Sequence, residues 1–210
     1  MGKGENMGRT VSVFQSVKQT VRKPKSESGH SIIKGIISGA YRKEVEPIRE
    51  KSKGGDSKGA NELKNKLPVI VWAGQFADRK KLIKHSGLLC IDIDGIGAGT
   101  QDAIGKLRKH PSVYTAFVSP RGNGVKAVFR VPPDKDIHTC AWQAAAQEAE
   151  KQTGFKADEA TKNINSLCFV SYDPEAYFNP DAEELAVSKS NEENKETKSN
   201  SPEELSQRKM

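Results

Sequence analysis

The sequence has no long apolar run. No stretch approaches the roughly 18 uninterrupted apolar residues that a membrane-spanning helix needs, and residues 1–10 lack the apolar segment of a signal peptide. We therefore expect a soluble, cytoplasmic protein with no membrane partner.

Cysteine and histidine are scarce and poorly spaced for metal binding. Cys90, Cys140 and Cys168 lie too far apart for a CxxC zinc site or a disulfide framework, so we expect reduced, structural thiols. The four histidines show no paired spacing, and we expect His110 and His138, near predicted helix ends, on the surface. A Walker A motif is also missing, which excludes a P-loop ATPase.

Charge is plentiful and unevenly distributed. The 210 residues include 34 basic and 27 acidic side chains, a net charge of +7 that favours phosphate-bearing partners. Polar composition predicts a flexible N-terminus (1–10), a mobile Lys/Gly-rich loop (51–66) and a disordered tail (187–210). One folded domain is expected over 11–186, with its core at 88–173.

The order of predicted elements indicates an α+β fold with a ferredoxin-like or RRM-like core. A helix (30–41) and a strand (68–73) form an N-terminal α/β extension. The core elements then follow as strand 88–94, helix 101–110, strands 113–119 and 124–131, helix 136–153 and strand 167–172. This β-α-β-β-α-β order predicts a four-stranded antiparallel sheet with its first and third strands central, one face covered by helices and the other open.

Charged residues gather on the predicted open face. Strand alternation places Asp92 and Asp94 there, and it places Lys126 and Arg130 beside them on the third strand. Carboxylates two residues apart on a strand are separated by roughly 6.5–7 Å and can share one cation. Oxygen ligands without nearby His or Cys select Mg²⁺ or Mn²⁺. Capping of the following glycine-rich turn is the alternative role for the two aspartates.

A third acid and a phosphate-binding turn are also predicted. Asp158 and Asp173 flank the last strand, and either can complete a metal site, although both can equally be loop residues. The turn from Ser119 to Lys126 contains Arg121, Gly122 and Gly124, and its glycines would let the backbone N–H groups approach an anion. A simple hairpin turn is the alternative.

These segments together resemble the archaeo-eukaryotic primase superfamily, in particular the primase-polymerase-like domains associated with VirE N-terminal regions. The resemblance covers about residues 11–186. It rests on VSVF (11–14), KLPVIVWAGQF (66–76), HSGLLCIDIDGI (85–96), SPRGNGVKAVFRV (119–131) and FVSYDPEAYFNPDA (169–182). It implies that Asp92 and Asp94 are metal ligands, that Asp158 is the third acid, and that Lys126 stands in the position of a phosphate-contacting histidine. The chain departs from the pattern at 165–167, where similar domains often carry an arginine.

The resemblance implies a metal-dependent nucleotidyltransferase, a DNA primase or polymerase in the replication of a mobile element or phage. Its partners would be single-stranded DNA or a primer-template, nucleoside triphosphates and a separate replicative helicase. A non-catalytic domain that binds nucleic acid or recruits a helicase is the first alternative. The second is a haloacid-dehalogenase-type phosphatase, because CIDIDG also looks like a DxDG element with Asp92 as nucleophile and Asp94 as acid/base.

Overall fold

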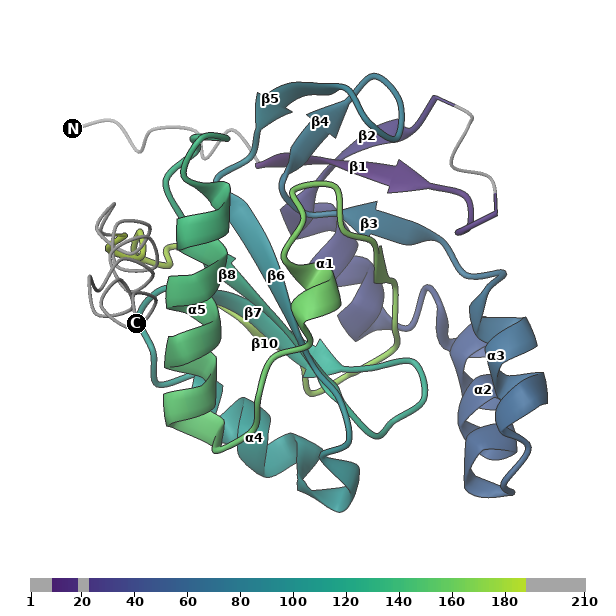
Figure 1. Cartoon of the computed structure of the whole chain (residues 1–210). Helices are drawn as coiled ribbons and strands as arrows, with labels where there is room; N and C mark the ends of the chain where they lie inside the picture. Colours follow the sequence, from purple (N-terminus) through teal and green to yellow (C-terminus); the bar gives the residue numbers. More distant parts are fainter. Residues whose placement is uncertain (1–8, 19–22, 188–210) are drawn as a thin grey trace, which may run out of the picture.

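The structure is a computed structural model that describes residues 9–18 and 23–187. Two four-stranded antiparallel sheets and a short hairpin form its β-structure (Figure 1). The predicted flexible N-terminus (1–10) and disordered tail (187–210) lie almost entirely outside the described residues. Within those residues no helix has the length and apolar character required to cross a membrane.

The N-terminal sheet has the strand order β2-β1-β3-β9. Its strands are β1 (Thr10–Phe14), β2 (Lys25–Ser28), β3 (Val69–Val71) and β9 (Cys168–Phe169). Helix α1 (Gly29–Ser38) follows β2, as the apolar spacing predicts. The Ser28 hydroxyl accepts the Ser31 N–H at its start, and Gly39 ends it with a positive φ of 86°. The hairpin of β4 (Gly74–Phe76) and β5 (Leu82–His85) extends from β3.

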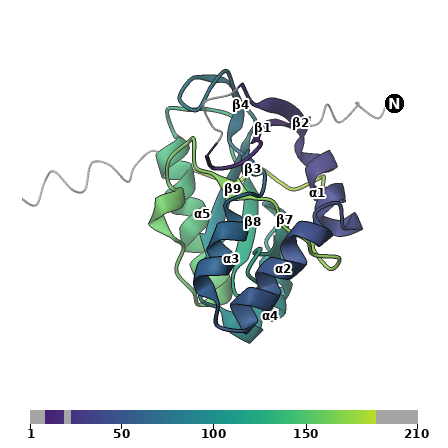
Figure 2. The ribbon, with the colours of Figure 1, turned by 90° about the vertical axis from the view of Figure 1, so that its right-hand side faces the viewer.

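A pair of helices occupies the segment for which we predicted a mobile loop. Helices α2 (Arg42–Lys53) and α3 (Ser57–Lys64) lie side by side (Figure 2), so the loop prediction for 51–66 is wrong. The Asp56 carboxylate caps α3 by accepting the Gly59 N–H at 2.8 Å, and Lys51 forms an ion pair with Asp56 at 2.7 Å. Buried Ala60 anchors α3 to the core. The loop prediction rested on the high Lys and Gly content of this segment and did not take the Asp56 cap or the buried position of Ala60 into account.

The C-terminal sheet has the strand order β10-β7-β8-β6. Its strands are β6 (Leu88–Ile93), β7 (Val113–Val118), β8 (Val125–Arg130) and β10 (Tyr177–Phe178). Helices α4 (Thr100–Leu107) and α5 (His138–Thr153) cover one face of this sheet. They bury Ile91, Ile93 and Phe129, which project from that face. Two short 3₁₀ turns, η1 (Gly97–Gly99) and η2 (Glu159–Thr161), lie near the end of β6 and beside it.

The position of the last strand departs from the ferredoxin-like order. The first and third core strands are neighbours as predicted, with Asp92 opposite Lys126 in the β6–β8 register. The strand predicted at 167–172, however, shrinks to β9 and pairs with β3 of the other sheet, while β10 takes the edge beside β7. Strand β6 is therefore an edge strand rather than a central one. The coarser prediction of an α+β fold with antiparallel sheets is confirmed.

The face predicted to be open is largely covered. Leu88, Tyr114, Phe117 and Val128 project from it into a second apolar cluster, where α1 and the N-terminal sheet bury them. Covering this surface is favourable because each fully buried side chain of this size contributes about 1.5–3 kcal/mol. The end of the face that carries Asp92 and Lys126 borders a cavity.

Candidate functional site

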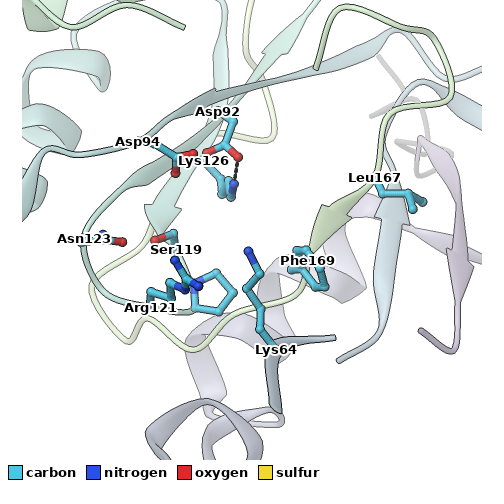
Figure 3. A pocket seen from close by; sticks show the side chains of 10 residues that line it. Lys64, Asp92, Asp94, Ser119, Arg121, Asn123, Lys126, Leu167 and Phe169 are labelled. Atoms are coloured by element: carbon cyan, nitrogen blue, oxygen red, sulfur yellow. Dashed lines mark hydrogen bonds and ion pairs between the residues drawn. The ribbon is translucent and has the colours of Figure 1, made fainter. Parts of the chain in front are cut away.

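A cavity of about 220 Å³ opens where the ends of β6 and β8 meet α3 and β9 (Figure 3). Its wall combines carboxylates, cations, one turn and two apolar side chains. The lining residues are Lys64, Asp92, Asp94, Ser119, Pro120, Arg121, Asn123, Lys126, Leu167 and Phe169. Both chain halves contribute to it, because Lys64 comes from α3 and the acids come from β6.

Three carboxylates converge beside this cavity. Asp92, Asp94 and Asp158 each offer an oxygen that lies within 4.8 Å of the others. Asp158 reaches the group because the chain after α5 returns along the free edge of β6, where the Asp158 N–H donates to the Asp92 carbonyl oxygen at 2.8 Å. Its side chain caps η2 through the Ala160 N–H at 3.0 Å. One of the two predicted third acids is therefore beside the pair.

The other predicted third acid has a structural position. Asp173 is buried, and its Oδ2 accepts the Val118 N–H at 2.8 Å while its Oδ1 accepts the Glu175 N–H at 3.1 Å. Both carboxylate oxygens are thus used to fix the end of β7 and the turn after β9. Asp173 belongs to the fold and not to the acidic group.

Asp92 is the electrostatic centre of the site. Its Oδ2 forms an ion pair with the Lys126 Nζ, and the two side chains are only 14% and 9% exposed. Its Oδ1 is buried and has no hydrogen-bond partner among the described residues. An unsatisfied buried carboxylate oxygen is costly, and binding of a cation would remove that cost. The unpartnered oxygen and the two neighbouring carboxylates fit a hard divalent ion such as Mg²⁺ or Mn²⁺.

The glycine-containing turn uses its N–H groups internally. The Gly122 N–H donates to the Ser119 carbonyl oxygen at 2.9 Å, and the Gly124 N–H donates to the Ser119 Oγ at 3.2 Å. The prediction that Gly122 and Gly124 present these groups to an anion is therefore wrong. Gly124 instead permits a close approach, because an added Cβ would lie 2.7 Å from the Ile93 carbonyl oxygen and 3.1 Å from Asp94 Oδ1.

Arg130 does not reach the cavity. It lies four residues from Lys126 along β8, roughly 13 Å away at the usual strand rise, and its Nη1 donates to the Ala182 carbonyl oxygen at 2.8 Å. Alternation along the strand correctly puts Lys126 and Arg130 on one face. It gives no information about which end of that face the second sheet covers.

Lys64 is a charged cavity residue that the sequence analysis missed. It ends α3 and points toward Asp92 and Lys126 (Figure 3), and its Nζ lies 4.7 Å from the centre of the Phe169 ring. Burial lowers the pKa of Lys64, and the positive charges of Lys126 and Arg121 lower that pKa further. The available signal was Asp56 as a helix cap followed by apolar residues three apart at Ala60 and Leu63.

Helices α2 and α3 also hold the turn in place. The Arg49 Nη2 donates to the Tyr172 carbonyl oxygen at 2.6 Å and to the Ser119 carbonyl oxygen at 3.4 Å. Arg121 donates to the Asn61 side-chain oxygen on α3. The helical pair thus fixes the turn from two sides and contributes Lys64 to the cavity.

A family model described as the BT4734-like N-terminal domain matches residues 62–178 of this chain. The chain belongs to the BT4734-like N-terminal domain family. The matched segment contains the three carboxylates, Lys126 and Lys64, so the whole candidate site lies within the family domain. No curated protein and no solved structure matches the chain.

Proposed function

We propose that this BT4734-like domain is a metal-dependent nucleotidyltransferase of the DNA primase or polymerase type. The observation that supports this most directly is the convergence of Asp92, Asp94 and Asp158 within 4.8 Å beside a cavity whose other walls carry cations. Carboxylates that hold divalent cations next to a phosphate-binding wall are the groups that phosphoryl transfer requires.

The three aspartates would hold Mg²⁺ or Mn²⁺, and Asp92 would bind the ion through its unpartnered Oδ1. When bound, such an ion supplies Lewis-acid stabilisation of the charge that develops on the phosphate oxygens. Lys126 would then divide its charge between Asp92 and the substrate phosphates.

Two further groups of the chain would orient the nucleotide. The Ser119 Oγ accepts the Gly124 N–H, which leaves its own O–H free to donate to a phosphate oxygen at the cavity wall. Arg121, held by Asn61, adds a second cation on the same wall. Fixed donors of this kind favour reaction because they need no reorganisation when charge develops.

We infer the biological setting from the resemblance to primase-polymerase-like domains. The substrates would be nucleoside triphosphates with single-stranded DNA or a primer-template, in the cytoplasmic replication of a mobile element or phage. A separate replicative helicase would be the protein partner. The net charge of +7 supports a polyanionic partner.

The test is incorporation of labelled nucleotides into primed and unprimed single-stranded DNA with Mg²⁺ or Mn²⁺. Asp92→Asn and Asp94→Asn keep side-chain size and should each lower incorporation by about a hundredfold or more, because each removes a metal-binding charge. Asp102→Asn is the matched control, since Asp102 is exposed on α4, where it pairs with Lys106. No incorporation by the wild-type protein, or equal incorporation by Asp92→Asn, would overturn the proposal.

The same experiment separates the alternatives. A domain that only binds DNA or recruits a helicase would retain DNA binding without any incorporation. A haloacid-dehalogenase-type phosphatase would hydrolyse a generic phosphomonoester through Asp92. That enzyme requires a parallel sheet, whereas every strand pair among the described residues is antiparallel.

A further inference from the structure

We propose that Lys64 is a phosphate-binding residue that lets the site distinguish nucleoside triphosphates from nucleotides with fewer phosphates. This inference rests on the proposed function, because it concerns the substrate of the same cavity. It assigns a direct role in that cavity to helix α3, which lies outside the β-α-β-β-α-β core in which the other predicted site residues reside.

The position of Lys64 is the first argument. Its side chain enters from the wall opposite Asp92 and Asp94, while the Phe169 ring flanks its ammonium group (Figure 3). A phosphate chain whose reacting end lies at the carboxylates would extend across the cavity. Its distal phosphates would therefore meet Lys64.

The electrostatic surroundings of Lys64 are the second argument. Lys126 is paired with Asp92, whereas no ion pair forms at Lys64 among residues 9–18 and 23–187. Burial, Lys126 and Arg121 lower the pKa of Lys64, whereas Asp94 raises it, so the charged form of Lys64 is only partly compensated. An anion placed between Lys64 and Arg121 would supply the missing compensation.

The construction of the wall is the third argument. Arg121, the cation next to Lys64, is held by Asn61 from one turn earlier on α3. The same helix thus supplies one phosphate ligand and orients a second. Two donors that one helix supplies or orients bind a polyanion with less loss of side-chain entropy than flexible surface lysines would.

Binding measurements test this role without requiring turnover. Calorimetric titrations with a nucleoside tri-, di- and monophosphate and with inorganic tripolyphosphate are made with Ca²⁺ present. Lys64→Met removes the charge and keeps the length, and it should weaken triphosphate binding by about tenfold to a hundredfold while monophosphate binding changes less than about threefold. Lys64→Arg should recover most of the affinity.

The control is Lys58→Met, because Lys58 is exposed on the same helix and does not line the cavity. Equal triphosphate affinity in Lys64→Met and the wild type would overturn the role of Lys64, as would a wild type that binds none of the four ligands. Lys64-dependent triphosphate binding without nucleotide incorporation would uphold the role of Lys64 and overturn the polymerase proposal. The experiment can therefore overturn either proposal without overturning the other.

Discussion

Asp92 is the central residue of the site, because it pairs with Lys126 and also belongs to the carboxylate group that would bind a cation. Removal of one partner from a largely buried ion pair strongly lowers the free energy of unfolding, since the other charge is left without a partner. Lys126 therefore stabilises the metal-free site and competes with metal for Asp92. This competition can be measured.

The first prediction concerns Lys126→Met. We expect this substitution to lower the free energy of unfolding without metal by about 2 kcal/mol or more, because Asp92 is left unpaired. We also expect Mn²⁺ to stabilise Lys126→Met more than the wild type. Urea unfolding with and without MnCl₂ measures both effects.

Lys106→Met is the control for that substitution. Lys106 pairs with Asp102 on the surface of α4, where the side chains are 45% and 70% exposed, so its loss should cost about 1 kcal/mol or less. Equal stabilisation of Lys126→Met and wild type by Mn²⁺ would show that Lys126 and the metal do not share Asp92.

The second prediction concerns Gly124. Alanine at this position would place its Cβ 2.7 Å from the Ile93 carbonyl oxygen, so the turn has to move away from β6 and Asp94. Gly124→Ala should therefore destabilise the protein by about 1–3 kcal/mol and reduce Mn²⁺ affinity. Thermal unfolding and Mn²⁺ titration are the measurements.

Gly105→Ala is the matched control, because Gly105 lies inside α4 and an added Cβ has no neighbour within 4 Å. It should stabilise the protein by about 0.5–1 kcal/mol and leave Mn²⁺ affinity unchanged. If Gly124→Ala behaved in the same way, the close contact between turn and strand would be irrelevant to the site.

At the scale of elements, a pair of buried histidines joins the β4–β5 hairpin to the start of α5. The His85 Nδ1 accepts the Gly87 N–H at 3.0 Å, so its Nε2 carries the proton and donates to the His138 Nδ1 at 3.3 Å. His138, predicted on the surface, is only 5% exposed. Burial and neighbouring His85 lower the pKa of His138 to about 4, and burial also lowers the pKa of His85.

The third prediction is that protonation of these histidines lowers the stability of the protein at acidic pH. Between pH 6.5 and about 4 the unfolded chain binds a proton at His138 and the folded chain does not, so the free energy of unfolding falls as the pH falls through this window. The loss from His138 reaches at most about 3 kcal/mol, and it is absent above pH 7. Urea unfolding at a series of pH values measures it.

His138→Gln is the diagnostic variant, because its side-chain oxygen can still accept the His85 Nε2–H but does not titrate over this range. We expect a weaker decline in stability below pH 6.5, with a remainder due to His85, whose pKa is also lowered by burial. A decline as steep as that of the wild type would assign the acid sensitivity to other groups.

Sequence patterns predicted where strands and helices occur better than they predicted which strands pair with one another. Alternation in LLCIDI and VKAVFR correctly gives β6 and β8 and places Asp92 and Lys126 on the same face of the sheet. The position of β9 was not predictable from such local patterns, because it depends on which sheet offers a free edge. The missed helices α2 and α3 carry few apolar residues, and the long-range contact of Arg49 with the Ser119 turn leaves no mark in local sequence.

At the scale of the molecule, the two sheets share one apolar cluster across chain segments that are distant in sequence. Trp72 lies in this shared cluster, whereas Trp142 lies in the cluster between the C-terminal sheet and its helices. The sheets meet through buried side chains such as Leu88 and Phe117. Neither half can expose this surface at low cost, so the halves should unfold together.

The fourth prediction is therefore a single cooperative transition. Trp72→Phe leaves Trp142 as the only tryptophan reporter, and Trp142→Phe leaves Trp72. In each variant the fluorescence and circular dichroism midpoints should coincide in urea. Separate midpoints for the two probes of one variant would mean that the sheets unfold independently.

The return of β9 to the N-terminal sheet has a consequence for synthesis of the protein. During translation, about a hundred residues are synthesised after β3 before Cys168 and Phe169 are available to pair with Ile70 and Val69. Until then the edge of β3 is unprotected, and the cavity lacks the wall that Phe169 provides. A nascent or prematurely terminated chain therefore has an incomplete cavity and is prone to aggregate through that edge.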